Sequence, residues 1–133
     1  MIQTTDASST TATLGGPTCD GATNVVTVVV NDGTYTDSVP CDGADGSFSF
    51  SGVSFNGDPS ITIFLDTNGG VQGTTISRTP TIDITDFDIY ANHVTVRQED
   101  VQPMTIARMV NADETYDSDI RFAAATGTPD TLT

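Results

Sequence analysis

Short hydrophobic segments alternate with polar positions along much of the chain, and turn-forming residues separate them. The clearest is 24–30, in which valines at every second position, Val26, Val28 and Val30, lie on one face. A period of two is typical of a strand with at least one buried face. Asn31-Asp32-Gly33 favours a tight turn, and 34–39 can return as the partner strand before Pro40 ends it. These patterns predict a β-hairpin.

The same alternation continues further along the chain. Strands are predicted at 47–53, 60–66, 71–78, 81–90, 93–97 and 120–124. Within 81–90 the aliphatic residues change phase, which predicts a bulge or strand break near residues 85–86. Val94 and Val96 are predicted to face inward from the next strand, with His93 on its outer, solvated face.

One segment departs from this pattern. Pro103 is followed by Met104, Ala107 and Val110, a spacing that favours a short helix near 103–111. Many short strands with frequent turn signals predict an all-β fold, an antiparallel β-sandwich with at most that one helix.

The ends of the chain are polar. Residues 1–16 are rich in Thr and Ser and are predicted to be an arm or linker, whereas 17–133 is predicted to be one domain with a polar C-terminal tail. An arm of this composition cannot form a core of its own. We therefore expect it to add as a strand to the sheet edge of a neighbouring subunit, and its candidate residues are Ile2, Thr4, Ala12 and Leu14.

Composition excludes several functions. The 133-residue chain has 18 acidic and 4 basic residues, a net charge of −14, which disfavours nucleic acid and anionic membranes as partners. It contains no lysine, so Schiff-base and phosphate-loop chemistry are excluded, and His93 is its only histidine. No stretch is apolar enough to insert into a membrane. No combination of nucleophile, base and orienting group is recognisable, and the chain is therefore predicted not to be an enzyme, with no required cofactor.

The two cysteines lie at the same end of the predicted hairpin. Cys19 precedes its first strand and Cys41 follows its second, so a disulfide between them is predicted. The alternative is a pair of free, partly buried thiols. A disulfide indicates an oxidising compartment and hence an extracellular location.

Acidic residues recur beside Gly and Asn at turns, which is the composition of Ca²⁺-binding loops. The candidate ligands are Asp42, Asp45, Asp66 and Asn68. Neither loop has the closing Glu of the full twelve-residue calcium pattern. The alternative is that Asp and Gly serve only as turn formers on an acidic, soluble surface.

The middle of the chain carries a family resemblance. Residues 25–66 contain the valine-rich strand, the turn and Thr-rich return strand, Asp45-Gly46-Ser47-Phe48-Ser49-Phe50-Ser51-Gly52-Val53, and Ile61-Thr62-Ile63-Phe64-Leu65-Asp66. This order resembles the transthyretin-like, carboxypeptidase-regulatory-like Greek-key β-sandwich, an Ig-like module similar to the B-type repeats of bacterial surface adhesins. The match covers about a third of the chain. Residues 65–70 and 87–94 are also similar to segments of very large bacterial cell-surface proteins.

The resemblance implies a building block of an extracellular stalk, adhesin or filament. B-type modules often carry a Lys–Asn isopeptide bond, which cannot form here because lysine is absent. The first functional hypothesis is therefore a non-catalytic structural or adhesive module whose partners are other copies or neighbouring domains. The alternative is a carbohydrate-binding module with Ca²⁺-supported loops, in which Tyr35, Tyr90 and Tyr116 contact a glycan.

Overall fold

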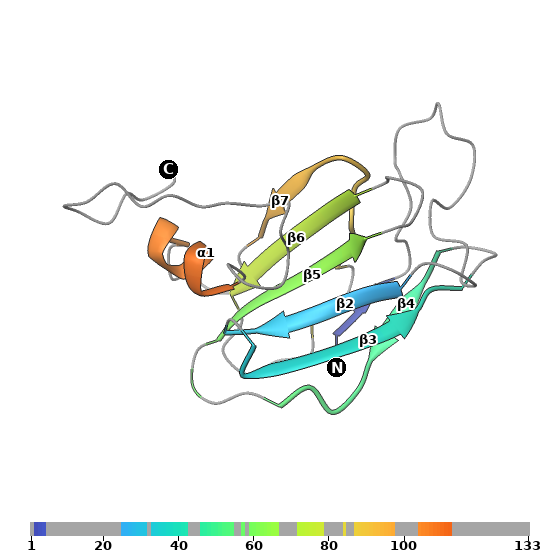
Figure 1. Ribbon diagram of the computed structural model, residues 1–133, viewed down its shortest axis with the longest axis horizontal. Helices are drawn as coiled ribbons and strands as arrows, with labels where there is room; N and C mark the ends of the chain where they lie inside the picture. Colours follow the sequence, from blue (N-terminus) through green and yellow to red (C-terminus); the bar gives the residue numbers. More distant parts are fainter. Residues whose placement is uncertain are drawn as a thin grey trace.

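The computed structural model describes residues 2–4, 25–31, 33–42, 46–54, 57, 59–66, 72–78, 84, 87–97 and 104–112. Its elements are β1 (Ile2–Thr4), β2 (Val25–Val30), β3 (Tyr35–Pro40), β4 (Phe48–Phe50), β5 (Ser60–Asp66), β6 (Gln72–Arg78), β7 (Val94–Val96) and α1 (Ile106–Ala112). Strands dominate the described part of the chain, which confirms the all-β prediction (Figure 1). The predicted strand 120–124 and most of the predicted arm 1–16 lie outside the described residues.

The predicted hairpin forms one side of the larger sheet, with β3 as the edge strand. This sheet has the order β3-β2-β5-β6-β7, and β2 pairs antiparallel with both β3 and β5. The turn after β2 places Asn31 at φ 45° and Gly33 at φ 94°, conformations that Asn and Gly tolerate best. The Asn31 side chain also accepts a hydrogen bond from the Ser60 amide at 2.9 Å, which fastens the hairpin turn to the start of β5.

The sheet is mixed rather than purely antiparallel, because β7 pairs with β6 in parallel. A parallel neighbour requires a crossover connection instead of a tight turn. Part of that connection passes directly over β6, where a Cβ atom on Gly73 would lie 2.5 Å from the Tyr90 carbonyl oxygen. The Thr75 hydroxyl donates a hydrogen bond to the Asp88 carbonyl and holds the crossing segment in place.

The prediction of a strand over 81–90 is wrong for the residues of that range that the structure describes. Ile84 forms only a single bridge, and 87–90 is not a strand. Ile84, Phe87 and Ile89 are nevertheless buried in the main core. Phe87 and Ile89 belong to a segment that packs across the face of the sheet. Residues 85–86, where a bulge or strand break is predicted, lie outside the described residues.

The inward orientation predicted for the β7 valines is also wrong. Val94 is 53% exposed and Val96 is 39% exposed. In the parallel register they lie beside Thr74 and Ile76, on the face opposite the main core. Arg97 instead faces the core side, with its guanidinium carbon 5.4 Å from the centroid of the Phe87 ring. His93 is exposed, as predicted.

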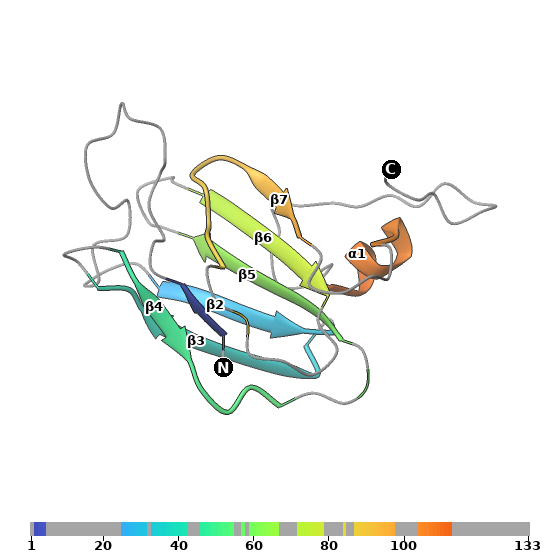
Figure 2. The ribbon, with the colours of Figure 1, turned by 180° about the vertical axis from the view of Figure 1, so that it is seen from behind.

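The main core lies between the two sheets. Its buried members are Val26, Val28, Val30, Cys41, Phe48, Phe50, Ile61, Ile63, Leu65, Ile84, Phe87 and Ile89. They come from one face of β2 and β5, from β4 and from the crossing segment, together with Cys41, which follows β3. Strands β1 and β4 form the second, two-stranded sheet, which lies in front of the larger sheet in Figure 2.

The opposite face of the larger sheet carries α1, and Met109 of this helix packs with Ile76 and with Met104, which precedes the helix. The prediction of a short helix near 103–111 is confirmed with a later start. The Thr105 hydroxyl accepts a hydrogen bond from the Arg108 amide at 3.2 Å, and the Met109 amide donates to the Thr105 carbonyl at 3.0 Å. Thr105 is therefore the N-cap, and the helix begins after it.

Thr62 on β5 provides a stability prediction. Its side chain is fully buried between Val29 and Ile76 in the strand registers, and its hydroxyl has no hydrogen-bond partner in the described structure. Replacing an unsatisfied buried hydroxyl by a methyl group of similar shape removes a desolvation cost. We expect Thr62→Val to raise the free energy of unfolding by about 1 kcal/mol in urea titrations. A decrease of that size would show that the hydroxyl has a partner in solution.

Candidate functional site

The N-terminal strand β1 pairs with the backbone edge of β4. Strand β1 pairs antiparallel with β4 in the register Ile2↔Phe50, Gln3↔Ser49 and Thr4↔Phe48. Two of the four predicted arm residues, Ile2 and Thr4, therefore belong to a strand that adds to a sheet edge. In the structure this edge belongs to the same chain. The other two arm residues, Ala12 and Leu14, lie outside the described residues.

β4 is fixed in place by its alternate side chains. Phe48 and Phe50 are buried in the main core, with ring centroids 6.0 Å apart in an edge-to-face arrangement. Ser49 between them is exposed. Among the described strands, β1 is the only one that hydrogen-bonds to β4. The strand is thus held by the core, and the N-terminal strand supplies its partner.

The larger sheet ends at β3 on one side and β7 on the other. On β3, Asp37 lies opposite Val28 in the register and so faces the core side of the sheet. Its carboxylate accepts hydrogen bonds from the Ser38 amide at 2.9 Å and from the Tyr35 hydroxyl at 3.5 Å. Desolvation of Tyr35, with the nearby negative charge and hydrogen bond of Asp37, raises the pKa of Tyr35. A charge on the inward side of an edge strand discourages pairing with another strand.

The predicted Ca²⁺ ligands fall mostly outside the described residues. Asp45, Asn68 and the side chain of Asp66 are not described, whereas Asp42 is exposed. The Asp42 amide donates to the Ser47 carbonyl at 2.8 Å and its carbonyl accepts from Gly46 at 2.7 Å. These bonds form the tight turn that leads from β3 into β4. Within the described ranges, no group of three or more His, Cys, Asp or Glu side chains is placed to hold a metal ion.

The predicted disulfide has one described member. Cys41 follows β3 directly, is 3% exposed and is not a free thiol. Its expected partner, Cys19, lies outside the described residues. The Cys19–Cys41 pairing therefore stays a prediction.

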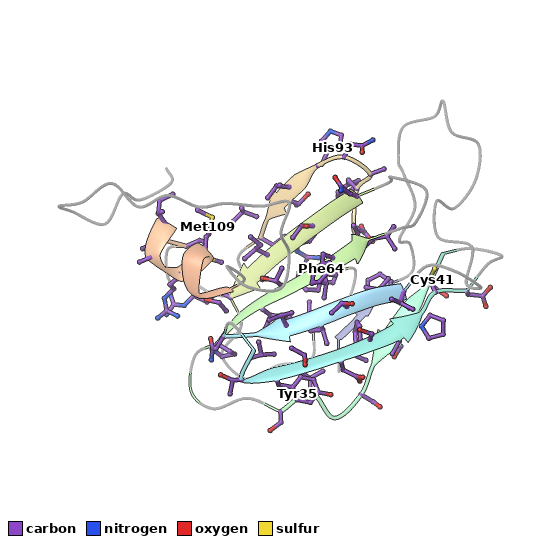
Figure 3. All side chains as sticks on the ribbon, in the orientation of Figure 1. Tyr35, Cys41, Phe64, His93 and Met109 are labelled. Carbon is purple, nitrogen blue, oxygen red and sulfur yellow. The ribbon has the colours of Figure 1, made fainter. Side chains whose placement is uncertain are left out.

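The tyrosines predicted to bind glycans do not share a surface in the described structure. Tyr35 is on the edge strand β3, whereas the Tyr90 carbonyl lies over Gly73 on β6, with β2 and β5 between them. Figure 3 shows Tyr35 and His93 at opposite edges of the larger sheet. The His93 ring is hydrogen-bonded through Nδ1 to the Ala91 carbonyl at 2.7 Å. Tyr116 lies outside the described residues.

The sequence pattern did not indicate the pairing of β1 with β4. The alternation of Phe48 and Phe50 with serines predicted a half-buried strand, and this is confirmed for Phe48–Phe50. A period of two identifies the buried face of a strand but not the strand beside it. The sequence therefore contained the signal for β4 and for a terminal arm, but no signal that joins them.

In the described part of the chain, no helix is long and apolar enough to cross a membrane. No family model, curated protein or solved structure matches the chain.

Proposed function

We propose that this chain is a non-catalytic structural or adhesive module of an extracellular cell-surface protein or filament, which assembles by strand addition through its N-terminal arm. The observation that carries the proposal is the pairing of Ile2–Thr4 with β4. The N-terminal residues adopt the extended conformation that strand addition requires, and they satisfy the edge of a strand that has no other described strand partner.

The extracellular part of the proposal depends on a Cys19–Cys41 disulfide. Cys41 is buried and bonded, and Cys19 is the only other cysteine of the chain. Closing a loop of about 20 residues would stabilise the fold by roughly 3 kcal/mol, chiefly by restricting the unfolded chain. The resemblance of residues 25–66 to transthyretin-like modules of surface adhesins supports the same compartment and a Greek-key arrangement of the two sheets.

The disulfide has a direct test. We expect the intact mass of the chain purified without reductant to lack two hydrogens relative to the reduced chain, and a proteolytic peptide pair to contain Cys19 joined to Cys41. The melting temperature should fall on reduction, because the crosslink restricts the unfolded state. Equal masses before and after reduction would remove the support for an oxidising compartment.

Deletion of residues 1–14 tests assembly through the arm. We expect the full chain, refolded at high concentration, to form oligomers in size-exclusion chromatography and electron microscopy, and the deletion to abolish them. Far-UV circular dichroism should still show a β spectrum, because the core residues that the structure describes come from β2, β4, β5 and the segments beside them, which the deletion leaves in place. The control is removal of residues 127–133, a polar segment at the other end, which should leave assembly unchanged. Oligomers that survive the N-terminal deletion would contradict the proposal.

A further inference from the structure

We propose that the edge of β4 is the acceptor site for β1 of a second copy of this chain, so that copies join by exchanging their N-terminal strands. This inference rests on the proposed function and specifies its partner and its site. The pairing that forms between copies is the one seen within the single chain, with Gln3 opposite Ser49.

β4 can accept β1 from its own chain or from a second copy. Phe48 and Phe50 anchor it in the core together with residues of β2 and β5. Only its backbone edge depends on β1, because among the described strands no other one hydrogen-bonds to it. An edge strand held this way presents N–H and C=O groups that any strand of matching register can satisfy.

The connection from β1 to the rest of its chain sets how far β1 can reach. β1 ends at Thr4, and the proposed disulfide holds Cys19 beside Cys41, so the 14 residues 5–18 set the reach of β1. At full extension they span up to about 50 Å. A compact domain of this length is roughly 35–40 Å across. The segment 5–18 is therefore long enough to carry β1 to the β4 edge of an adjacent copy.

β3 and β7, the two outer strands of the larger sheet, are the edges that compete with β4. On β3, Asp37 faces the core side, which opposes the arrival of another strand. β7 is three residues long, like β4, but no described strand pairs with its outer edge, so no register is defined there. β4 is the edge at which the N-terminal strand already has a defined register.

The same β1–β4 pairing forms within one chain or between two chains, so the protein concentration decides which of the two dominates. Within one chain, the covalent connection keeps β1 near β4 at an effective concentration of the order of 1 mM. Dilute chains therefore close on themselves. Chains refolded near that concentration, or aligned side by side, pair with one another. Each copy donates one strand and accepts another at a different place, so exchange that is not reciprocal between two copies and does not close into a ring propagates into fibres.

A cysteine pair across the β1–β4 register tests the inference. Gln3→Cys and Ser49→Cys place the new thiols on directly opposite positions, where Cβ atoms are about 4.5–5.5 Å apart. The double variant is refolded at about 1 mM and at a hundredfold dilution, oxidised, and run on a non-reducing gel. We expect a ladder beyond dimers at high concentration and a crosslinked monomer when dilute. Each single variant is the control and stops at dimers.

The outcomes separate the two proposals. If fibres form but the double variant crosslinks only within single chains, another edge accepts the arm and this inference fails while the proposed function stands. If neither the native chain nor the variant forms oligomers at high concentration, the proposed function itself fails. A double variant that forms no crosslink at either concentration contradicts the β1–β4 pairing.

Discussion

Phe50→Ala is expected to lower the free energy of unfolding by about 3–5 kcal/mol. Phe50 is 1% exposed and belongs to the core between the two sheets, where its ring meets that of Phe48 edge to face. Truncation removes the buried ring and leaves a cavity that the two sheets cannot fully close. Urea titration followed by circular dichroism measures the loss.

Ser49→Ala is the matched control, because Ser49 lies on the same strand with its side chain exposed. Its effect should stay within about 0.5 kcal/mol. If Phe50→Ala costs no more than the control, β4 does not pack on the larger sheet. In that case the acceptor edge would have no fixed position. The comparison therefore tests the foundation of the assembly proposal as well as the core.

Gly73→Ala is expected to destabilise the chain by about 2–3 kcal/mol, the upper part of the range for overpacking. The added Cβ would lie 2.5 Å from the Tyr90 carbonyl oxygen and 2.8 Å from Cγ2 of Ile89. The backbone at Tyr90 cannot withdraw alone, because the Asn92 amide donates to the Gln72 carbonyl and Thr75 holds Asp88. The whole crossing segment must shift from the sheet.

Gly57→Ala separates crowding from backbone effects. Gly57 has a φ of +72° and open space around the added Cβ, so only backbone strain of about 1 kcal/mol is expected there. Thermal and urea unfolding of both variants measures the difference. Equal losses would show that the crossing segment does not lie against β6, and that the parallel placement of β7 is wrong.

The segments that sequence analysis predicted best are those whose pattern and turn chemistry agree. The Asn31 turn, the valine alternation of β2 and the Ile61–Leu65 alternation of β5 each indicate the same local structure. β6 also forms where a strand was predicted, although three Thr and Ser residues in it are buried. Local pattern sufficed there because these strands lie at the centre of the larger sheet.

The errors lie where neighbours decide the structure. Val94 and Val96 have the alternation of an inward face, but a parallel partner and the crossing segment place Arg97 on the core side instead. Phe87 and Ile89 are core residues without being in a strand. For the candidate site, composition indicated a terminal arm, whereas the identity of the edge beside it depends on contacts between residues far apart in the sequence.

The most direct test of the assembly proposal is the size of the native, unreduced chain as a function of concentration. Size-exclusion chromatography, with negative-stain electron microscopy of the same fractions, measures it. We predict monomers of 13.9 kDa in dilute solution, and oligomers and ordered fibres in chains refolded at high concentration. Monomers alone at every concentration would contradict strand addition through the N-terminal arm.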